Sequence, residues 1–329
     1  MKILYCVQLT GNGHVTRANE LIPEFKKVAK VDVLTSGNQS SLEIKGKVNF
    51  KFRGLSFVFG SRGGVDIFKT ILNLRPFTFI KDVFNLQVKN YDLIINDFEP
   101  VSAWACKFRG VPCYSMSRQF SLLQKNSFNK VKPKLYEFLI LKYFAPSING
   151  IGFDYKKDNS NNFYPIIKSD IKRKKVINKN HYTIYLPSFS IENIINFFSS
   201  LDEVIWHVFS PKINKPFKKE NLSFFPTDYK VFEQSILSCK GIVSNAGFET
   251  TSEALYLDKK LLIIPMKNQF EQQYNASILS NMGIKILLDL KQKRLDSVKE
   301  WILLKKSVKV NYDYSYKSII EKTLLDFNK

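Results

Sequence analysis

Short apolar runs alternate with amphipathic segments along the whole chain. Between the runs, apolar residues recur every three or four positions, most clearly at Ala18, Leu21, Ile22, Phe25 and Val28, and this spacing predicts a helix with one buried face. The alternation of strand and helix predicts a parallel sheet covered by helices on both faces. The strands expected in the first half lie at 2–7, 31–36, 50–59, 92–97, 111–116 and 149–153.

The second half of the chain repeats this pattern. Its expected strands lie at 182–188, 203–209, 222–225, 241–245, 261–266 and 285–288, and its expected helices lie at 191–201, 229–240, 250–257 and 269–282. The segment between the halves is rich in Lys, Asn and Ser, which is typical of a crossing between domains. We therefore expect an α/β protein with two Rossmann-like, doubly wound domains at 1–165 and 181–312, a linker at 166–180 and a terminal helix at 313–329.

Ligands of open parallel sheets bind at the carboxyl ends of the strands, so the loops after strands are the places to look for chemistry. The first such loop, at residues 10–17, contains Gly11 and Gly13 and leads into a helix whose N–H groups favour an anion. A dinucleotide fingerprint is incomplete here, because Thr16 stands where the third glycine is required and Asp32 lies inside its strand. We expect no nicotinamide cofactor.

His14 in this first loop is a candidate general base, because an imidazole titrates near working pH. Its candidate orienting partner is Asp97, which ends another predicted strand of the same sheet. A pair of this kind fixes the tautomer of the imidazole and stabilises the imidazolium. The alternatives are a histidine that caps a helix or fills a gap, and an aspartate that caps a helix or lies on the surface.

The second candidate loop follows the strand at 241–245 and opens another helix. Gly247 permits close approach of a ligand, and Thr250, Thr251 and Ser252 place hydroxyl groups near the first helical turn, which together favour a diphosphate. Glu253 has two interpretations. It either accepts hydrogen bonds from a ribose, or it completes a capping box with Thr250 and needs no ligand.

A run of side-chain amides follows the next predicted strand. Five amides and one acid lie between Asn268 and Asn275, and each amide offers two donors and one acceptor, as sugar recognition requires. The polar start of a surface helix is the alternative interpretation.

At these residues the sequence resembles GT-B glycosyltransferases. The resemblance rests on Gly247-x-x-Thr250-x-x-Glu253, on Ile264-Pro265, on Gln272-Gln273-x-Asn275-Ala276 and on Gly11-x-Gly13-His14. The nearest pattern is that of the N-acetylglucosaminyltransferase that completes the lipid-linked cell-wall precursor, and UDP-sugar transferases acting on small molecules share a looser version.

This resemblance implies two domains facing a cleft and a role for each matching residue. Glu253 would bind the donor ribose, Gly247, Thr250 and Thr251 would line the diphosphate, and Glu271, Gln272 and Gln273 would contact the donor sugar. His14 would act as the base beside Gly11 and Gly13. One departure is Asn245, which stands near the place where the relatives carry a His or an Arg, so part of the diphosphate charge must be met elsewhere.

Charge narrows the set of partners. Lys and Arg number 50 against 29 Asp and Glu, a formal net charge of +21, which favours anionic partners. The segment 118–142 carries cations among apolar residues and suggests an anionic membrane surface, although an ordinary solvated face has the same pattern. The run Lys172-Arg173-Lys174-Lys175 lacks the aromatic residues of a nucleic-acid motif, so we expect no nucleic acid partner.

Metal and disulfide chemistry are not expected. The four cysteines are widely spaced, the three histidines have no metal-ligand spacing, and no D-x-D motif suited to Mg²⁺ occurs. The first apolar run is too short for a signal peptide and no stretch is long enough to span a membrane, which fits a cytoplasmic protein, peripheral on the inner face of the membrane at most.

We therefore expect a metal-independent, inverting glycosyltransferase that moves a sugar from a nucleotide-sugar, a UDP-sugar first, to a glycan, lipid-linked or small-molecule acceptor of the cell envelope. Acceptor specificity would lie at 60–66 and 118–134. One rival is a UDP-sugar 2-epimerase of the same fold, for which Asp97, Glu99 and Glu271 are the candidate acids. The other rival is a non-catalytic basic protein that binds membrane or glycan.

Overall fold

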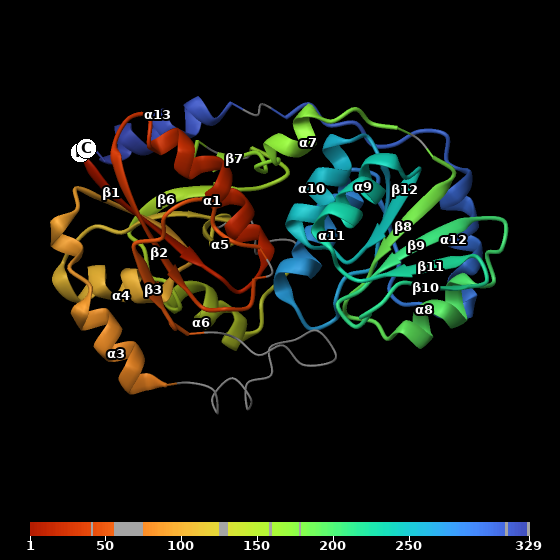
Figure 1. Ribbon diagram of the computed structural model, residues 1–329, viewed down its shortest axis with the longest axis horizontal. Helices are drawn as coiled ribbons and strands as arrows, with labels where there is room; N and C mark the ends of the chain where they lie inside the picture. Colours follow the sequence, from red (N-terminus) through yellow and green to blue (C-terminus); the bar gives the residue numbers. More distant parts are fainter. Residues whose placement is uncertain are drawn as a thin grey trace. The chain divides into compact units, whose positions relative to one another are not determined.

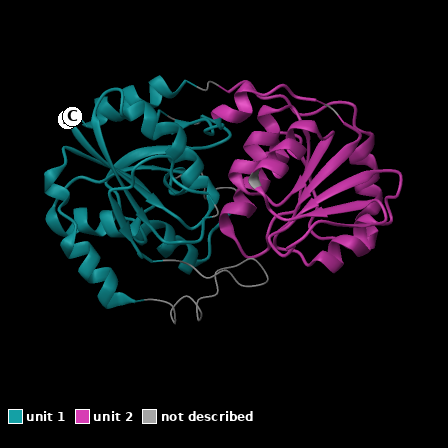
Figure 2. Ribbon diagram, viewed as in Figure 1, with its two compact units in different colours: residues 1–58, 65–168, 313–329 teal, residues 59–64, 169–312 magenta. Residues whose placement is uncertain are grey.

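The computed structural model describes residues 1–40, 42–55, 75–124, 131–157, 160–177, 179–312 and 315–327. These residues form two compact units (Figure 2). Unit 1 holds the described residues up to Lys168 together with those after Tyr312, and unit 2 holds those in Ser169–Tyr312. Along the described residues, the chain therefore passes from unit 1 to unit 2 and back once.

Unit 1 contains a parallel sheet with the strand order β3-β2-β1-β4-β5-β6-β7 (Figure 1). Its central strands are buried on both faces, as expected for a parallel sheet covered by helices. Tyr5 of β1 contacts Phe25 on one face, whereas Leu4 and Cys6 join a core cluster on the other. The strands are β1 (Lys2–Gln8), β2 (Lys30–Ser36), β3 (Phe50–Phe52), β4 (Leu93–Asp97), β5 (Tyr114–Ser117), β6 (Asn149–Phe153) and β7 (Asn162–Phe163).

Helices cover the two faces of this sheet. The helices of unit 1 are α1 (Asn12–Phe25), α3 (Pro76–Asn85), α4 (Pro100–Arg109), α5 (Arg118–Leu122), α6 (Leu135–Tyr143) and α13 (Tyr316–Phe327). The last helix returns to α1, because the Tyr316 hydroxyl donates to Glu20 Oε2 at 3.0 Å and to the Ile167 carbonyl at 2.8 Å. Ile319, Ile320 and Thr323 are buried on its inner face.

Unit 2 contains a second sheet with the order β10-β11-β9-β8-β12-β13-β14. All neighbouring strands are parallel except β10 and β11. Its core packs Trp206, Trp301 and Phe198 together with aliphatic side chains. The strands are β8 (His181–Tyr185), β9 (Ile205–Phe209), β10 (Phe217–Lys219), β11 (Leu222–Phe225), β12 (Gly241–Ser244), β13 (Lys260–Ile263) and β14 (Lys285–Ile286). The helices are α7 (Ser169–Arg173), α8 (Ile191–Phe198), α9 (Tyr229–Ser238), α10 (Phe248–Tyr256), α11 (Phe270–Asn281) and α12 (Leu295–Leu303).

Both sheets reverse their strand order at one point. In unit 1 the chain adds β2 and β3 on one side of β1 and then places β4 on the other side. In unit 2 it adds β9, β11 and β10 on one side of β8 and then places β12 on the other. The loops after β1 and β4, and those after β8 and β12, therefore adjoin at the carboxyl edges, where such sheets bind ligands.

Several local expectations need correction. Val28 lies beyond the end of α1 and is half exposed, so the buried face of that helix ends at Phe25. The expected linker contains α7, which the sequence analysis did not predict, and β7 precedes it. The edge strand β10 was not expected from the sequence, because it is short and fully exposed and therefore has no apolar alternation. Residues 56–59 of the expected third strand, and the proposed specificity segment 60–66, lie outside the described residues.

Candidate active site

The start of α1 places His14 directly above the carboxyl end of β1. Helix α1 begins at Asn12 with Gly11 as its N-cap, so His14 lies in the first helical turn and not in a loop, as the sequence had suggested. No side chain caps this helix end. His14 is 9% exposed, which leaves part of its ring accessible.

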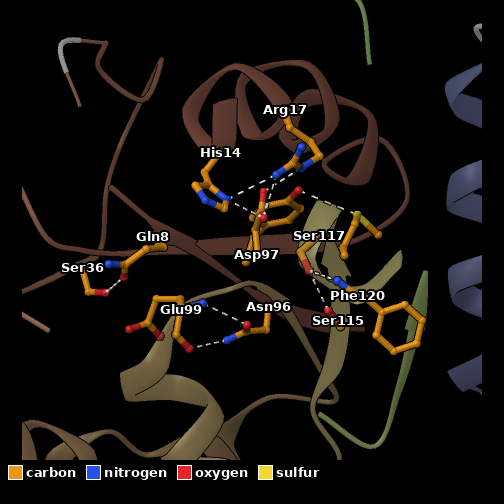
Figure 3. Close-up of polar contacts among 12 residues, drawn as sticks. Gln8, His14, Arg17, Ser36, Asn96, Asp97, Glu99, Ser115, Ser117 and Phe120 are labelled. Carbon is orange, nitrogen blue, oxygen red and sulfur yellow. Dashed lines mark hydrogen bonds and ion pairs between the residues drawn. The ribbon is translucent and has the colours of Figure 1, made fainter. Parts of the chain in front are cut away.

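His14 meets Asp97, as predicted from the sequence (Figure 3). The parallel register pairs Val7 with Asp97, which brings the last residue of β4 level with the start of α1. His14 Nδ1 lies 2.8 Å from Asp97 Oδ1, and the Asp97 side chain is fully buried. Asp97 is therefore neither a surface acid nor a helix cap.

Arg17 completes the cluster, a role that the sequence analysis did not assign. Its Nε donates to Asp97 Oδ2 at 2.8 Å and its Nη2 donates to Oδ1 at 2.9 Å. Because Arg17 follows His14 by three residues in a helix, both side chains lie on the same face. That spacing was visible in the sequence, but the charge that Arg17 pairs with is 80 residues away.

The charge state of Asp97 follows from these contacts. Burial alone would raise the pKa of the Asp97 carboxyl, but the charges and hydrogen bonds of Arg17 and His14 outweigh burial and hold the pKa below its ordinary value. An ionised carboxylate can only accept hydrogen bonds. His14 therefore carries its proton on Nδ1, and its Nε2 is the nitrogen that can accept another.

Glu99 is the helix cap in this region. Its carboxylate accepts hydrogen bonds from the N–H groups of Val101 and Ser102, each at 2.7 Å, and from the Ser102 hydroxyl at 2.6 Å. It is fully buried at the N-terminus of α4. This role accounts for Glu99 without catalysis and removes one of the acids that the epimerase alternative needs.

The second glycine loop joins β12 to α10 in unit 2. Helix α10 begins at Phe248 with Gly247 as its N-cap and no side-chain cap, so Thr250 lies inside the helix. The alternative in which Thr250 and Glu253 form a capping box is therefore wrong. Glu253 is buried on α10. The Thr251 hydroxyl donates to the Gly247 carbonyl at 2.8 Å and the Ser252 hydroxyl donates to that of Phe248 at 2.6 Å, so both turn back along the helix.

The predicted amides brace the loops after β12 and β13. Gln272 Oε1 accepts from the N–H groups of Ala246 at 3.2 Å and Met266 at 3.0 Å. Gln273 Nε2 donates to the Met266 carbonyl at 2.6 Å. Asn275 Nδ2 donates to the Ala246 carbonyl at 2.9 Å. These side chains fix the shape of the loops, whereas Glu271 is the half-buried acid at the start of the same helix.

Asn245 connects three strand ends. Its Nδ2 donates to the Ile264 carbonyl at 2.7 Å, and its Oδ1 accepts from the Ser188 hydroxyl at 3.0 Å. A cavity of about 360 Å³ opens beside this contact, at the carboxyl ends of β8, β13 and β14. One lining residue, Lys267, carries a positive charge. The full lining is Ser188, Phe189, Asn193, Pro265, Met266, Lys267, Asn268, Leu288 and Asp289.

The described residues show no metal site and no membrane span. Within them, no group of three or more His, Cys, Asp and Glu side chains is arranged to hold a metal ion. None of their helices is long and apolar enough to cross a bilayer.

Comparison with known proteins identifies the family. A family model described as glycosyl transferase family 1 matches residues 1–304. A search of curated proteins finds no match. Among solved structures, MurG of Acinetobacter baumannii is 10% identical with a TM-score of 0.60, and the alignment covers 98% of this chain and 99% of that chain.

Two further structures are similar over their whole length. Arabidopsis thaliana UGT89C1, complexed with UDP, is 13% identical with a TM-score of 0.63, over 98% of this chain and 99% of that chain. The glycosyltransferase VinC, in complex with dTDP, is 11% identical with a TM-score of 0.56, over 100% of this chain and 95% of that chain. The two doubly wound units are thus the two Rossmann-like domains of the GT-B fold, and this chain belongs to glycosyl transferase family 1.

Proposed function

We propose that this glycosyltransferase moves a sugar from a nucleotide-sugar, in the first instance a UDP-sugar, to an acceptor hydroxyl, with His14 as the base. The observation that carries the proposal is the 2.8 Å contact between His14 Nδ1 and the buried Asp97 carboxylate. It lies at the point where the strand order of its sheet reverses. The ring has its proton on Nδ1, so Nε2 is available to an acceptor.

The chemistry is a direct displacement at the anomeric carbon. The acceptor oxygen forms a bond to that carbon while the bond from carbon to the diphosphate oxygen breaks, and the acceptor proton passes to His14 Nε2. The electron pair leaves with the diphosphate, and the configuration inverts. Asp97 then faces an imidazolium, whose positive charge it stabilises.

The donor half of the site is proposed at the second glycine loop. The N-terminus of α10, whose N-cap Gly247 has no side chain, directs its helix dipole toward a diphosphate, and Lys267 in the adjoining cavity offers a positive charge. In this proposal Glu253 binds the ribose, Thr250 and Thr251 adjoin the diphosphate, and Glu271, Gln272 and Gln273 lie on the sugar side. Two of the similar structures are complexes with UDP and dTDP, which supports a nucleotide donor. The leaving group is stabilised by the protein alone, without a metal ion.

Calorimetry with added nucleotide tests the donor half. UDP should bind in the micromolar range without metal and should outcompete ADP, GDP and dTDP, and Glu253→Ala should lose this binding. A different preferred nucleotide would change the donor, and no binding by any of them would overturn the donor site.

His14→Ala should retain UDP affinity but lose about 100-fold or more in kcat, because general base catalysis contributes about that much. Full transfer by His14→Ala would overturn the base.

We also propose an anionic membrane surface as a second partner, bound by helix α6 and not by the whole segment 118–142. Arg118 is buried and pairs with Asp154 at 2.8 Å, so it cannot belong to the basic surface expected at 118–142. Residues 125–130 of that segment lie outside the described residues. Helix α6 retains the pattern, because Leu135, Leu139 and Tyr143 are exposed beside Lys134 and Lys142.

Vesicle flotation tests this partner. The protein should bind vesicles that contain phosphatidylglycerol more strongly than neutral ones at low salt, and Leu135→Glu with Leu139→Glu should abolish the difference. Helix α3 exposes a separate apolar face with Phe77 and Ile80, so Phe77→Glu with Ile80→Glu is the matched control. Equal binding to both kinds of vesicle would refute the proposal.

A further inference from the structure

Arg17 and His14 share one oxygen of a buried carboxylate (Figure 3). Asp97 Oδ1 lies 2.8 Å from His14 Nδ1 and accepts from Arg17 Nη2 at 2.9 Å. The same Nη2 lies 3.2 Å from His14 Nδ1. The positive charge of the guanidinium is therefore in direct contact with the imidazole ring.

This contact changes what Asp97 does to the histidine. A buried carboxylate that faced His14 alone would favour the imidazolium strongly, because opposite charges attract in a poorly solvated site. A ring that is already protonated cannot take a proton from an acceptor. Arg17 compensates the carboxylate charge in advance, and its own charge repels a second proton on the ring.

The guanidinium is also held in one orientation. Its Nε donates to Asp97 Oδ2 at 2.8 Å, so both oxygens of the carboxylate are engaged by a planar fork. The guanidinium carbon lies 5.1 Å from the centre of the Phe153 ring, which packs against it. Arg17 is 3% exposed. A fixed carboxylate in turn fixes the ring that donates to it.

We propose that Arg17 is the positioning residue of this site, which compensates the charge of Asp97 and holds its carboxylate so that the imidazole proton of His14 stays on Nδ1. The inference rests on the proposed role of His14 as the base. In this proposal Arg17 contacts neither the acceptor nor the nucleotide-sugar donor and acts through His14 and Asp97.

The other titratable groups nearby are already occupied or neutral. Tyr5 from β1 stays uncharged, because burial and then the Asp97 charge raise its pKa well above the ordinary value. Glu99, after β4, binds the N-terminus of α4. Arg118 at the start of α5 pairs with Asp154. Among these described groups, Arg17 is the cation whose side chain contacts the His14 imidazole.

Nitrogen NMR of labelled histidines tests the proposal without any transfer assay. The chain has three histidines, so His14 is assigned by the signal that disappears in His14→Gln. Arg17→Met should raise the titration midpoint of His14 by about one pH unit or more, as the loss of an adjacent charge does. Arg17→Lys keeps the charge and should leave the midpoint near that of the unaltered protein.

Arg118→Met is the matched control, because it removes another buried Arg–Asp pair of unit 1. It should lower thermal stability and leave the midpoint of His14 unchanged. Equal midpoints in Arg17→Met and Arg118→Met would overturn the proposal. If Arg17→Met does not fold, the unaltered protein decides the question. Its neutral His14 ring should carry the proton on Nδ1, and a neutral ring protonated on Nε2 would overturn it.

A transfer assay separates this inference from the proposed function. If His14 is the base, the acidic limb of the kcat/KM profile should move to higher pH in Arg17→Met together with the NMR midpoint. If no acceptor supports transfer, the proposed function fails while the NMR comparison still measures the effect of Arg17. A midpoint that shifts without any movement of the acidic limb would refute the role of Arg17 in catalysis.

Discussion

At the scale of single residues, Gly11 and Gly247 are the N-caps of α1 and α10. Their backbone angles φ are 173° and −70°, which any residue can adopt. A Cβ atom added at either position would meet no other atom within 4 Å. Neither backbone strain nor packing explains these glycines, whereas the proposed close approach of a ligand to the backbone would require them.

Replacement of Gly247 by alanine tests this explanation. Gly247→Ala should change the free energy of unfolding by about 1 kcal/mol or less, because the methyl group has room and only the quality of the N-cap changes. It should weaken UDP binding about tenfold or more, because the methyl group enters the space of the diphosphate. Gly110→Ala is the control, since its φ of 64° makes alanine strained without affecting the donor. Unchanged UDP affinity in Gly247→Ala would contradict the assignment.

Single residues also mark the limit of what the sequence could predict. The pairing of His14 with Asp97 was predictable, because both follow strands of one parallel sheet and the register brings them level. The role of Arg17 was not, because a buried arginine and an exposed one look alike until the partner charge is placed. Glu99 looked like a catalytic candidate, but its hydrogen bonds to the backbone of α4 are local and make it a cap.

At the scale of elements, most parallel strands were predictable, whereas the two-residue strand β7 and the helix starts were not. Continuous apolar runs fixed the strands because both faces of each sheet are covered. Helices α1 and α10 begin earlier than expected, since glycine N-caps without side-chain bonds carry no local signal such as Ser or Thr provides. The sequence did not show that Gln272 and Asn275 of α11 hold backbone groups of neighbouring loops, because those partners lie more than 20 residues away.

Two stacked histidines on β8 and β9 predict that the free energy of unfolding of unit 2 falls in acid. The rings of His181 and His207 stack with centroids 3.9 Å apart. Burial, and then the His207 charge, lower the pKa of His181 from 6.5 to about 4, and burial followed by the Lys179 charge lowers that of His207. Lys179 and Lys259 add to the repulsion of a proton on His181.

The sign of the pH effect follows from linkage. The unfolded chain binds these protons near pH 6.5 and the folded unit does not, so stability is complete above pH 6.5 and falls as the pH drops toward 4. The expected loss at pH 4 is on the order of 3 kcal/mol for His181. Urea unfolding monitored by the fluorescence of Trp206 and Trp301 measures it, in a Trp104→Phe background. His181→Asn should lose most of this pH dependence, and an unchanged dependence would assign it to other groups.

At the scale of the whole molecule, unit 1 is built from two separate parts of the chain, the described residues before Ser169 and those after Tyr312. The apolar pattern of α13 was visible in the sequence, but its place on α1 was not, because the contact spans almost the whole chain. Deletion of the residues after Tyr312 should destabilise unit 1 by several kcal/mol, since it exposes the surface that Ile319 and Ile320 cover. Hydrogen exchange should then increase in α1 and β7 and stay unchanged in α9 and β12. Equal increases in both units would contradict this division.

The return of α13 to unit 1 has a consequence for synthesis on the ribosome. Unit 1 begins with β1, which is made before unit 2, yet unit 1 lacks a packed helix until the residues after Tyr312 have emerged. Unit 2 is continuous from Ser169 to Tyr312, so its segment is complete before α13 exists. Domains fold as units while the chain emerges. Unit 1 therefore cannot complete its packing until α13 has been made. Until then the face of α1 that α13 covers is exposed, and it is the surface that a chaperone would bind.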